Sequence, residues 1–224
     1  MLSTFQEAIA LLTQLDTAVL GIVLVSLQVS LSALFFGTLL GLPIGALLAT
    51  EEFKGKRVTI VALNTLMGVP TVIIGVLVYL MLSRTGPLGA WGWLFTVKGM
   101  ILAQILLTTP LIAALSRQIL EDSWKIHRDT FLSLRLPSMA RFKWLIWDCR
   151  FPLTIAILAG LGRAISEVGA VMIVGGNIDH STRTMTTAIA LETSKGDLPL
   201  ALALGFVLLG VVLLANFLTS ILLQ

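Results

Sequence analysis

Charged side chains are scarce in this sequence. Only 12% of its 224 residues are Asp, Glu, Lys or Arg, whereas a soluble domain averages about 25%. Hydrophobic residues make up 57% of the chain, and its mean hydropathy is +0.98. Too few charges remain to cover a water-facing surface, so lipid must form part of the surrounding solvent. The length fits one domain, and the composition predicts that this domain is embedded in a membrane.

Cysteines and enzyme motifs are also scarce or missing. Cys149 is the single cysteine, so no disulfide forms within the chain. The sequence has no G-x-x-x-x-G-K-[ST] loop for ATP, no H-E-x-x-H or closely spaced Cys and His set for a metal, and no G-x-S-x-G elbow. The basic residues do not form a stripe with aromatics, which argues against nucleic acid as a partner. We therefore expect no enzyme, no metal and no cofactor bound by this chain.

Long charge-free runs define the expected spans, because a helix needs about 20 apolar residues to cross the hydrocarbon core. The run between Asp16 and Glu51, for example, holds no charge at all. Five spans are expected, over about 18–49, 58–82, 99–115, 152–174 and 198–223. Residues 116–151 form a long loop between the third and fourth spans. The fold class is thus all-α integral membrane, with residues 18–224 as one domain.

The distribution of Lys and Arg predicts how the spans are oriented. Loops on one side hold ten Lys and Arg residues, and loops on the other side hold four. Cytoplasmic loops carry the basic excess, so the N-terminus is expected outside and the C-terminus inside. Residues 1–17 have apolar side chains at helical spacing. They predict either a short helix along the outer membrane surface or a frayed terminus.

Small residues recur at every fourth position in two of the spans. They are Ala33, Gly37, Gly41, Gly45 and Ala49 in the first span, and Gly162, Ser166 and Ala170 in the fourth. Such a stripe lets another helix approach closely, where packing replaces the hydrophobic drive that lipid removes. We interpret Gly37, Gly41, Gly45 and Gly162 as helix-packing positions, with contact to a substrate as the alternative.

Two charges interrupt the fourth span. Arg163 and Glu167 are four residues apart, so on a continuous helix they share a face and can pair. A charge inside a span usually faces the protein interior or a water-filled path. Two interpretations stay open. Either Arg163, Ser166 and Glu167 line a translocation path or gate, or the two charges form an ion pair that fixes helix packing.

Hydroxyl groups surround an arginine in the outer loop between the fourth and fifth spans. Arg183 is followed by Thr184, Thr186 and Thr187. A guanidinium among hydroxyls offers the hydrogen-bond donors that an oxyanion needs. These four residues predict an outer mouth for an anion, and the alternative is a loop whose hydroxyls cap its own backbone.

Apolar and charged side chains alternate in the long inner loop, unlike in a plain polar linker. This mixture predicts a helical segment over roughly residues 128–136 that docks on a partner. The residues expected at that contact are Arg128, Asp129, Phe131, Leu132, Leu134 and Arg135.

Three long runs of this sequence resemble the permease subunit of ABC importers of the tungstate type. They are residues 162–178 (GRAISEVGAVMIVGGNI), 182–190 (TRTMTTAIA) and 192–197 (ETSKGD). The five-span layout resembles the same family from about Val19 onward, and molybdate and sulfate permeases are related families. The resemblance implies the transmembrane fold of a type I ABC importer and a homodimeric pore in the cytoplasmic membrane of a prokaryote. It also implies two copies of a separate ATPase, which uses the ATP, and an outer binding protein that delivers a tetrahedral oxyanion.

The inner-loop signature of that family is degenerate here. It reads Glu-Ala-Ala, three residues, Gly, nine residues, then Ile-x-Leu-Pro. Counting back from Pro152 places Met139 at the glycine, whereas matching residues 132–135 to the tungstate branch places Asp129 at the acid and Arg135 at the glycine. We prefer the second alignment because it keeps the acid.

Together these features predict the membrane-spanning subunit of an ATP-driven tungstate importer, with molybdate or sulfate as alternative cargo. Its expected partners are a second copy, two ATPase subunits, the outer binding protein and membrane lipid. A stand-alone channel or secondary transporter is the rival from another class. Five spans, however, do not divide into two equal inverted repeats. A membrane scaffold, the third hypothesis, would show no ATP-dependent flux.

Overall fold

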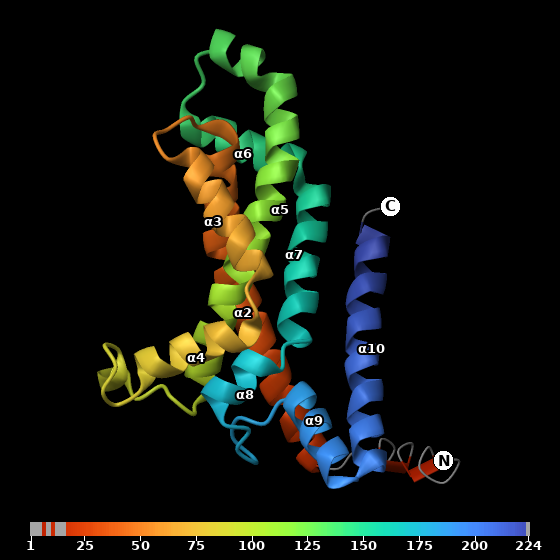
Figure 1. Ribbon diagram of the computed structural model, residues 1–224. Coiled ribbons are helices and arrows are strands. Elements are labelled where there is room, and N and C mark those ends of the chain that lie inside the picture. The colour runs from red at the N-terminus through yellow and green to blue at the C-terminus, as the bar shows by residue number, and fades with distance from the viewer. Residues whose placement is uncertain (1–5, 8–9, 12–16, 223–224) are drawn as a thin grey trace.

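The computed structural model of this chain describes residues 6–7, 10–11 and 17–222. Within these ranges the chain forms helices and loops and no strand. Most of the helix predicted along the outer membrane surface, over residues 1–17, lies outside the described residues. The described helices form an elongated bundle (Figure 1).

Three of the described helices are long and apolar enough to cross a membrane. They are α2 (Thr17–Thr50), α5 (Val97–Ser133) and α10 (Leu198–Leu222). Two further pairs pass the same test only together, because each pair is bent: α3 (Lys56–Gly68) with α4 (Thr71–Leu82) by 101°, and α6 (Ser138–Asp148) with α7 (Arg150–Ile165) by 79°. Five crossings therefore result only if each bent pair counts as one span.

The second expected span, 58–82, is not one straight helix. Helix α3 ends at Gly68, and Val69 adopts an extended conformation with φ −67° and ψ 131°. Pro70 explains the break, because proline disfavours a helical residue before it and has no N–H to continue the ladder. Helix α4 consequently leaves the bundle sideways (Figure 1).

The third span does not end at Leu115, because α5 continues to Ser133 as a helix of 37 residues. Glu121 forms ion pairs with both Arg117 and Lys125, each four residues away, and such pairs support a helix. Much of the predicted loop 116–151 is therefore helical, comprising the end of α5 and all of α6. The separate short helix predicted over residues 128–136 is wrong: it is the end of α5 and the turn that follows.

The fourth expected span, 152–174, is also divided. Helix α7 ends at Ile165, and α8 (Gly169–Gly175) begins after a break at residues 166–168. Two side chains take over backbone hydrogen bonds there. The Ser166 hydroxyl donates to the Gly162 carbonyl (2.8 Å), and the Glu167 carboxylate accepts from the Ala170 N–H (3.0 Å). Such local bonds compete with the helical ladder. The outer loop that follows contains another helix, α9 (Met185–Lys195).

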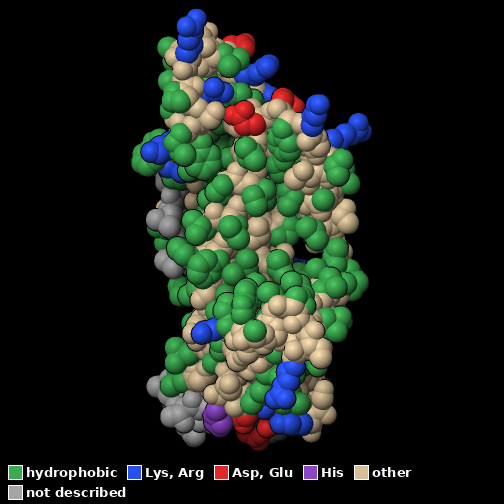
Figure 2. Space-filling model, turned by 90° about the vertical axis from the view of Figure 1, so that its left-hand side faces the viewer, with side chains coloured by type: hydrophobic (Ala, Val, Ile, Leu, Met, Phe, Trp, Pro, Cys, Tyr) green, Lys and Arg blue, Asp and Glu red, His purple; other side chains and the backbone are tan. Residues whose placement is uncertain are grey.

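The two ends of the molecule carry most of its charge (Figure 2). One end, which we call the basic end, consists of the α2–α3 connection, the α5–α6 connection and α6. The opposite end, the far end, consists of the α4–α5 connection, the α8–α9 connection and α9. On the face that Figure 2 shows, hydrophobic side chains are spread over the surface between the two ends and charged side chains are few there, as expected for a chain surrounded by lipid.

The glycine stripe of α2 lies against α5. A Cβ atom added to Gly41 would lie 3.0 Å from the Ile112 side chain, and one added to Gly45 would lie 2.7 Å from the Ala113 carbonyl oxygen. Gly37 faces the Thr108 side chain just as closely. The partner of this stripe is therefore in the same chain. The prediction of Gly162 as a helix-packing position is not met by the described residues of this chain, because a Cβ atom added there would meet nothing within 4 Å.

Gly45→Ala is expected to destabilise the chain by about 1–3 kcal/mol, because the new methyl group collides with backbone that cannot move aside. Gly21→Ala is the matched control: Gly21 lies on the same helix, and a Cβ atom added there meets nothing within 4 Å. It should be neutral or stabilising by up to about 1 kcal/mol. Thermal unfolding of the purified chain in detergent compares the two. Equal melting temperatures would show that this packing is not tight.

Candidate functional site

Two helix breaks, α3–α4 and α7–α8, lie next to each other in the fold. Helices α4 and α8, which follow the two breaks, pack together (Figure 1). Gly169 sits at the contact: a Cβ atom there would lie 3.1 Å from the Thr71 hydroxyl and 3.6 Å from the Glu167 carboxylate. The start of α4 and the start of α8 therefore meet at Thr71, Glu167 and Gly169.

The α7–α8 break leaves backbone groups without helical partners, and three side chains bind them. The Gln104 amide on α5 donates to the Ala164 carbonyl (2.9 Å), and the Thr186 hydroxyl on α9 donates to the Glu167 carbonyl (2.7 Å). The Glu167 carboxylate itself accepts from Ala170. Non-helical backbone at membrane depth occurs only inside protein or beside a water-filled cavity, and broken helices at that depth line transport sites. This break is therefore the candidate site.

Glu167 and Arg163 do not form the predicted pair. Glu167 is buried, with 5% of its surface exposed, while Arg163 is half-buried on α7. No ion pair to Arg163 is found in the described part of the chain. The reason is the break: α7 ends at Ile165, so a spacing of four residues no longer puts both charges on one helix face. Ser166 lies at the break and is exposed.

The three threonines predicted at an outer mouth are buried and bonded within the chain. Thr184 and Thr187 form a reciprocal capping box at the start of α9, and Thr186 holds the Glu167 carbonyl. Their hydroxyls cap backbone groups, so the alternative interpretation of this loop describes them. Arg183 is different, because its guanidinium reaches the hollow described below.

The sequence-based prediction missed two polar residues that position the break. Gln104 is a lone amide in the apolar first half of α5, and this isolation was the signal. Ser26 on α2 accepts a hydrogen bond from the Met185 N–H (2.7 Å) and so fixes the start of α9. A serine among apolar residues is common in membrane helices, so nothing in the sequence marked Ser26.

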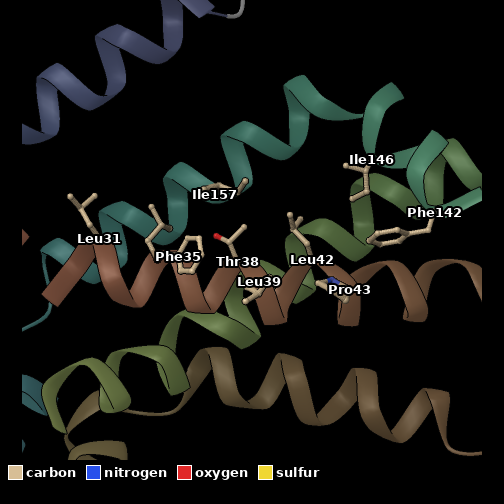
Figure 3. A pocket seen from close by; sticks show the side chains of 10 residues that line it. Leu31, Phe35, Thr38, Leu39, Leu42, Pro43, Phe142, Ile146 and Ile157 are labelled. Atoms are coloured by element: carbon tan, nitrogen blue, oxygen red, sulfur yellow. The ribbon is translucent and has the colours of Figure 1, made fainter. Parts of the chain in front are cut away.

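An apolar groove of about 590 Å³ lies between α2, α6 and α7 (Figure 3). Leu31, Phe35 and Leu39 line one side and Ile157 the other. The one hydroxyl in its lining belongs to Thr38 and is buried without a partner. A groove with a single polar group cannot replace the water around a dianion, so the candidate path lies at the helix breaks.

Comparison with known proteins identifies the family. No family model matches the chain, but individual proteins match most of it. A probable anion ABC transporter permease of Haloferax volcanii is 41% identical over 205 residues, which cover 89% of this chain and 88% of that protein. The tungstate uptake permease TupB of Peptoclostridium acidaminophilum is 39% identical over 205 residues (92% and 90%), and that of Campylobacter jejuni is 40% identical over 168 residues (75% and 70%).

This chain belongs to the tungstate-type family of ABC importer permeases. It is accordingly a multi-pass membrane protein, and its relatives are transporter subunits rather than enzymes. The resemblance found in residues 162–178 and 182–190 is thereby confirmed. The first run contains the α7–α8 break, and the second contains the start of α9, whose Thr186 binds the backbone of that break.

The predicted docking segment of the permease surrounds the turn after α5. Leu132 and Leu134 are exposed there, as are Arg128, Asp129 and Arg135. Phe131 is not available for docking, because it is buried with 3% exposure and stacks on Trp124 at a ring distance of 5.8 Å. The surface left for a partner is therefore a leucine pair with a charged rim.

Arg135 has a left-handed backbone conformation, with φ at +49°. Met139, the other candidate for the signature glycine, is an ordinary helical residue of α6. Glycine is the residue that adopts positive φ at no steric cost. The geometry therefore favours the alignment that places Arg135 at the glycine and Asp129 at the acid.

Thr186→Val should destabilise the permease by about 1–3 kcal/mol, because the Glu167 carbonyl then stays buried without its donor. Thr65→Val is the control, since the exposed Thr65 hydroxyl donates to the Val61 carbonyl of its own helix and, among the described residues, to no other group. Melting temperatures followed by tryptophan fluorescence measure both. A Thr65→Val loss as large as that of Thr186→Val would contradict a special role for this bond.

Arg135→Gly should stabilise the permease by about 1 kcal/mol, since glycine relieves the left-handed strain. Arg135→Ala removes the same charge and side chain but keeps the Cβ atom, so it should give no such gain. A melting temperature raised equally by both variants would attribute the effect to lost charge instead of backbone conformation.

Proposed function

We propose that this permease is the membrane-spanning subunit of an ATP-driven importer for a tetrahedral oxyanion, with tungstate as the cargo. The observation that carries this proposal is identity of about 40% to two tungstate uptake permeases, over 75% and 92% of this chain. The Haloferax relative, named only as an anion permease, agrees with the charge of the cargo. Molybdate and sulfate are the alternative oxyanions.

ATP is bound by a partner in this proposal, because the sequence lacks a P-loop. Two ATPase subunits dock at the basic end, which is the cytoplasmic end by its excess of Lys and Arg. Exposed Leu132 and Leu134, with Asp129 beside them, supply the contact. An extracytoplasmic binding protein docks at the far end and delivers the anion.

A second copy of the permease completes the path. Arg163 has no acidic partner in the described part of its own chain, and Ser166 is exposed on the neighbouring turn. A charge that faces lipid is costly, so such residues face a protein interior or a water-filled path. Pairing two copies around this side of α7 encloses Arg163 and Ser166 and lets them line the path.

Transport requires that the path bind its anion weakly enough to release it. The break provides few fixed charges, since Glu167 is buried and bonded to backbone and the threonines beside it are bonded within the chain. The two adjacent breaks also divide the second and fourth expected spans into shorter helices, α3 with α4 and α7 with α8. Relative motion of these shorter helices opens a path to one side at a time.

Reconstitution in liposomes with the ATPase and the binding protein tests the proposal. We expect ATP-dependent uptake of tungstate that exceeds uptake of molybdate and sulfate. Asp129→Arg and Leu132→Asp should each lower it by roughly tenfold or more, as loss of a central contact does. Asp122→Arg is the control, because Asp122 is exposed nearly two turns earlier on α5. Flux that needs no ATPase would instead indicate a channel, and no flux at all a scaffold.

A further inference from the structure

A shallow hollow of about 270 Å³ lies at the far end of the permease. One wall is the start of α2, from Gly21 to Val25, and the other is the α8–α9 connection. The α2 wall offers apolar side chains and a glycine. The connection contributes polar and charged groups, which are Asp179, His180, Ser181 and Arg183.

Arg183 is the strongest hydrogen-bond donor in this hollow. Its side chain is only 17% exposed, and its Nη1 lies 3.0 Å from Asp179 Oδ1. Its Nε is buried and has no hydrogen-bond partner. A guanidinium binds an oxyanion best through two parallel N–H bonds, whereas the Asp179 carboxylate engages only Nη1.

The turn that carries these residues is rigid. The buried Thr182 hydroxyl donates to the Gly175 carbonyl (2.6 Å) and accepts from the Ile178 N–H (2.9 Å). The N–H groups of residues 181, 182 and 183 all point to the Ile178 carbonyl, at 3.3, 3.0 and 3.0 Å. Arg183 is thus presented by a fixed backbone.

Asp179 is the movable member of the ion pair. Its side chain is 56% exposed, and the same Oδ1 that meets Arg183 also accepts the His180 N–H at 3.0 Å. The His180 ring lies at the edge of the pair, with Nε2 3.8 Å from Asp179 Oδ2. A half-exposed carboxylate can turn into water without breaking the fold, because exposed ion pairs contribute about 1 kcal/mol or less.

We propose that this hollow is a low-affinity site for a tetrahedral dianionic oxyanion, in which the Asp179 carboxylate competes with the anion for Arg183. When the anion enters, Asp179 turns away, and two oxygens of the anion accept hydrogen bonds from Nη1 and Nη2, the end-on fork of the guanidinium. The tethered carboxylate then displaces the anion again. The identity of the anion rests on the proposed function, but its binding is a property of this chain alone.

A built-in competitor suits a site that must pass its ligand on. An unopposed arginine in a partly buried hollow would hold a dianion and slow its release. Removing the competitor should therefore tighten binding, and removing the arginine should abolish it. A purely structural Asp179–Arg183 ion pair predicts neither change.

The test measures binding of sodium tungstate to the full-length permease in nanodiscs of zwitterionic phosphatidylcholine, without partner subunits and at low ionic strength. Isothermal titration calorimetry should show that Asp179→Asn lowers the Kd at least about fivefold. Arg183→Gln should remove binding. Arg183→Lys, which keeps the charge but loses the fork, should weaken binding while preserving the fold.

Two controls separate this site from general charge effects. Asp197→Asn removes a carboxylate near α9 while keeping the cap on the Leu200 N–H, because asparagine caps a helix as well as aspartate does. Arg84→Gln removes an exposed arginine of the α4–α5 connection. Both should leave the tungstate Kd unchanged.

Three outcomes would overturn the proposal: an Asp197→Asn gain equal to that of Asp179→Asn, binding that survives Arg183→Gln, or no binding by any variant. The uptake experiment is independent of this one. Binding as predicted without ATP-driven uptake keeps the site and refutes the importer. ATP-driven uptake with binding that ignores both variants keeps the importer and refutes the site.

Discussion

The permease depends on satisfying backbone polar groups away from water. Each N–H or carbonyl left without a partner in lipid costs several kcal/mol, so a break in a helix must be bonded by something else. At the α7–α8 break, Gln104 from α5, Thr186 from α9 and Glu167 itself supply those bonds. Helices α5 and α9, which lie far from this short segment in the sequence, are therefore both tied to it, and their positions cannot change independently.

The close packing of α2 on α5 gives this segment a firm support. Gly37, Gly41 and Gly45 let the two backbones approach so closely that an added methyl group would collide. Helix α5 in turn carries Gln104, which holds the end of α7. The glycine stripe and the helix break are thus connected through α5: the close packing of α2 on α5 positions Gln104, and Gln104 binds the Ala164 carbonyl at the break.

Composition and charge-free runs were enough to predict a helical membrane protein, and three runs of residues were enough to indicate its family. The breaks were harder to predict. Pro70 was a visible signal inside the second span, but the end of α7 at Ile165 depends on side chains from α5 and α9 that sequence spacing does not bring together. Arg163 and Glu167 illustrate this limit, because their spacing matches a pair only if the helix continues.

The length of α5 has a mechanical consequence. Its 37 residues span about 55 Å, well beyond a hydrocarbon core of about 30 Å, so its tip stands far outside the bilayer at the basic end. A displacement of this tip is therefore transmitted along α5 toward Gln104. Pro110 lies between the two and makes the helix easier to bend there, because proline removes one backbone hydrogen bond. Gly41 and Gly45 pack against residues 109–117 of α5, so α2 stiffens α5 next to Pro110. Motion of the tip therefore reaches the Ala164 carbonyl only while α2 and α5 stay packed together.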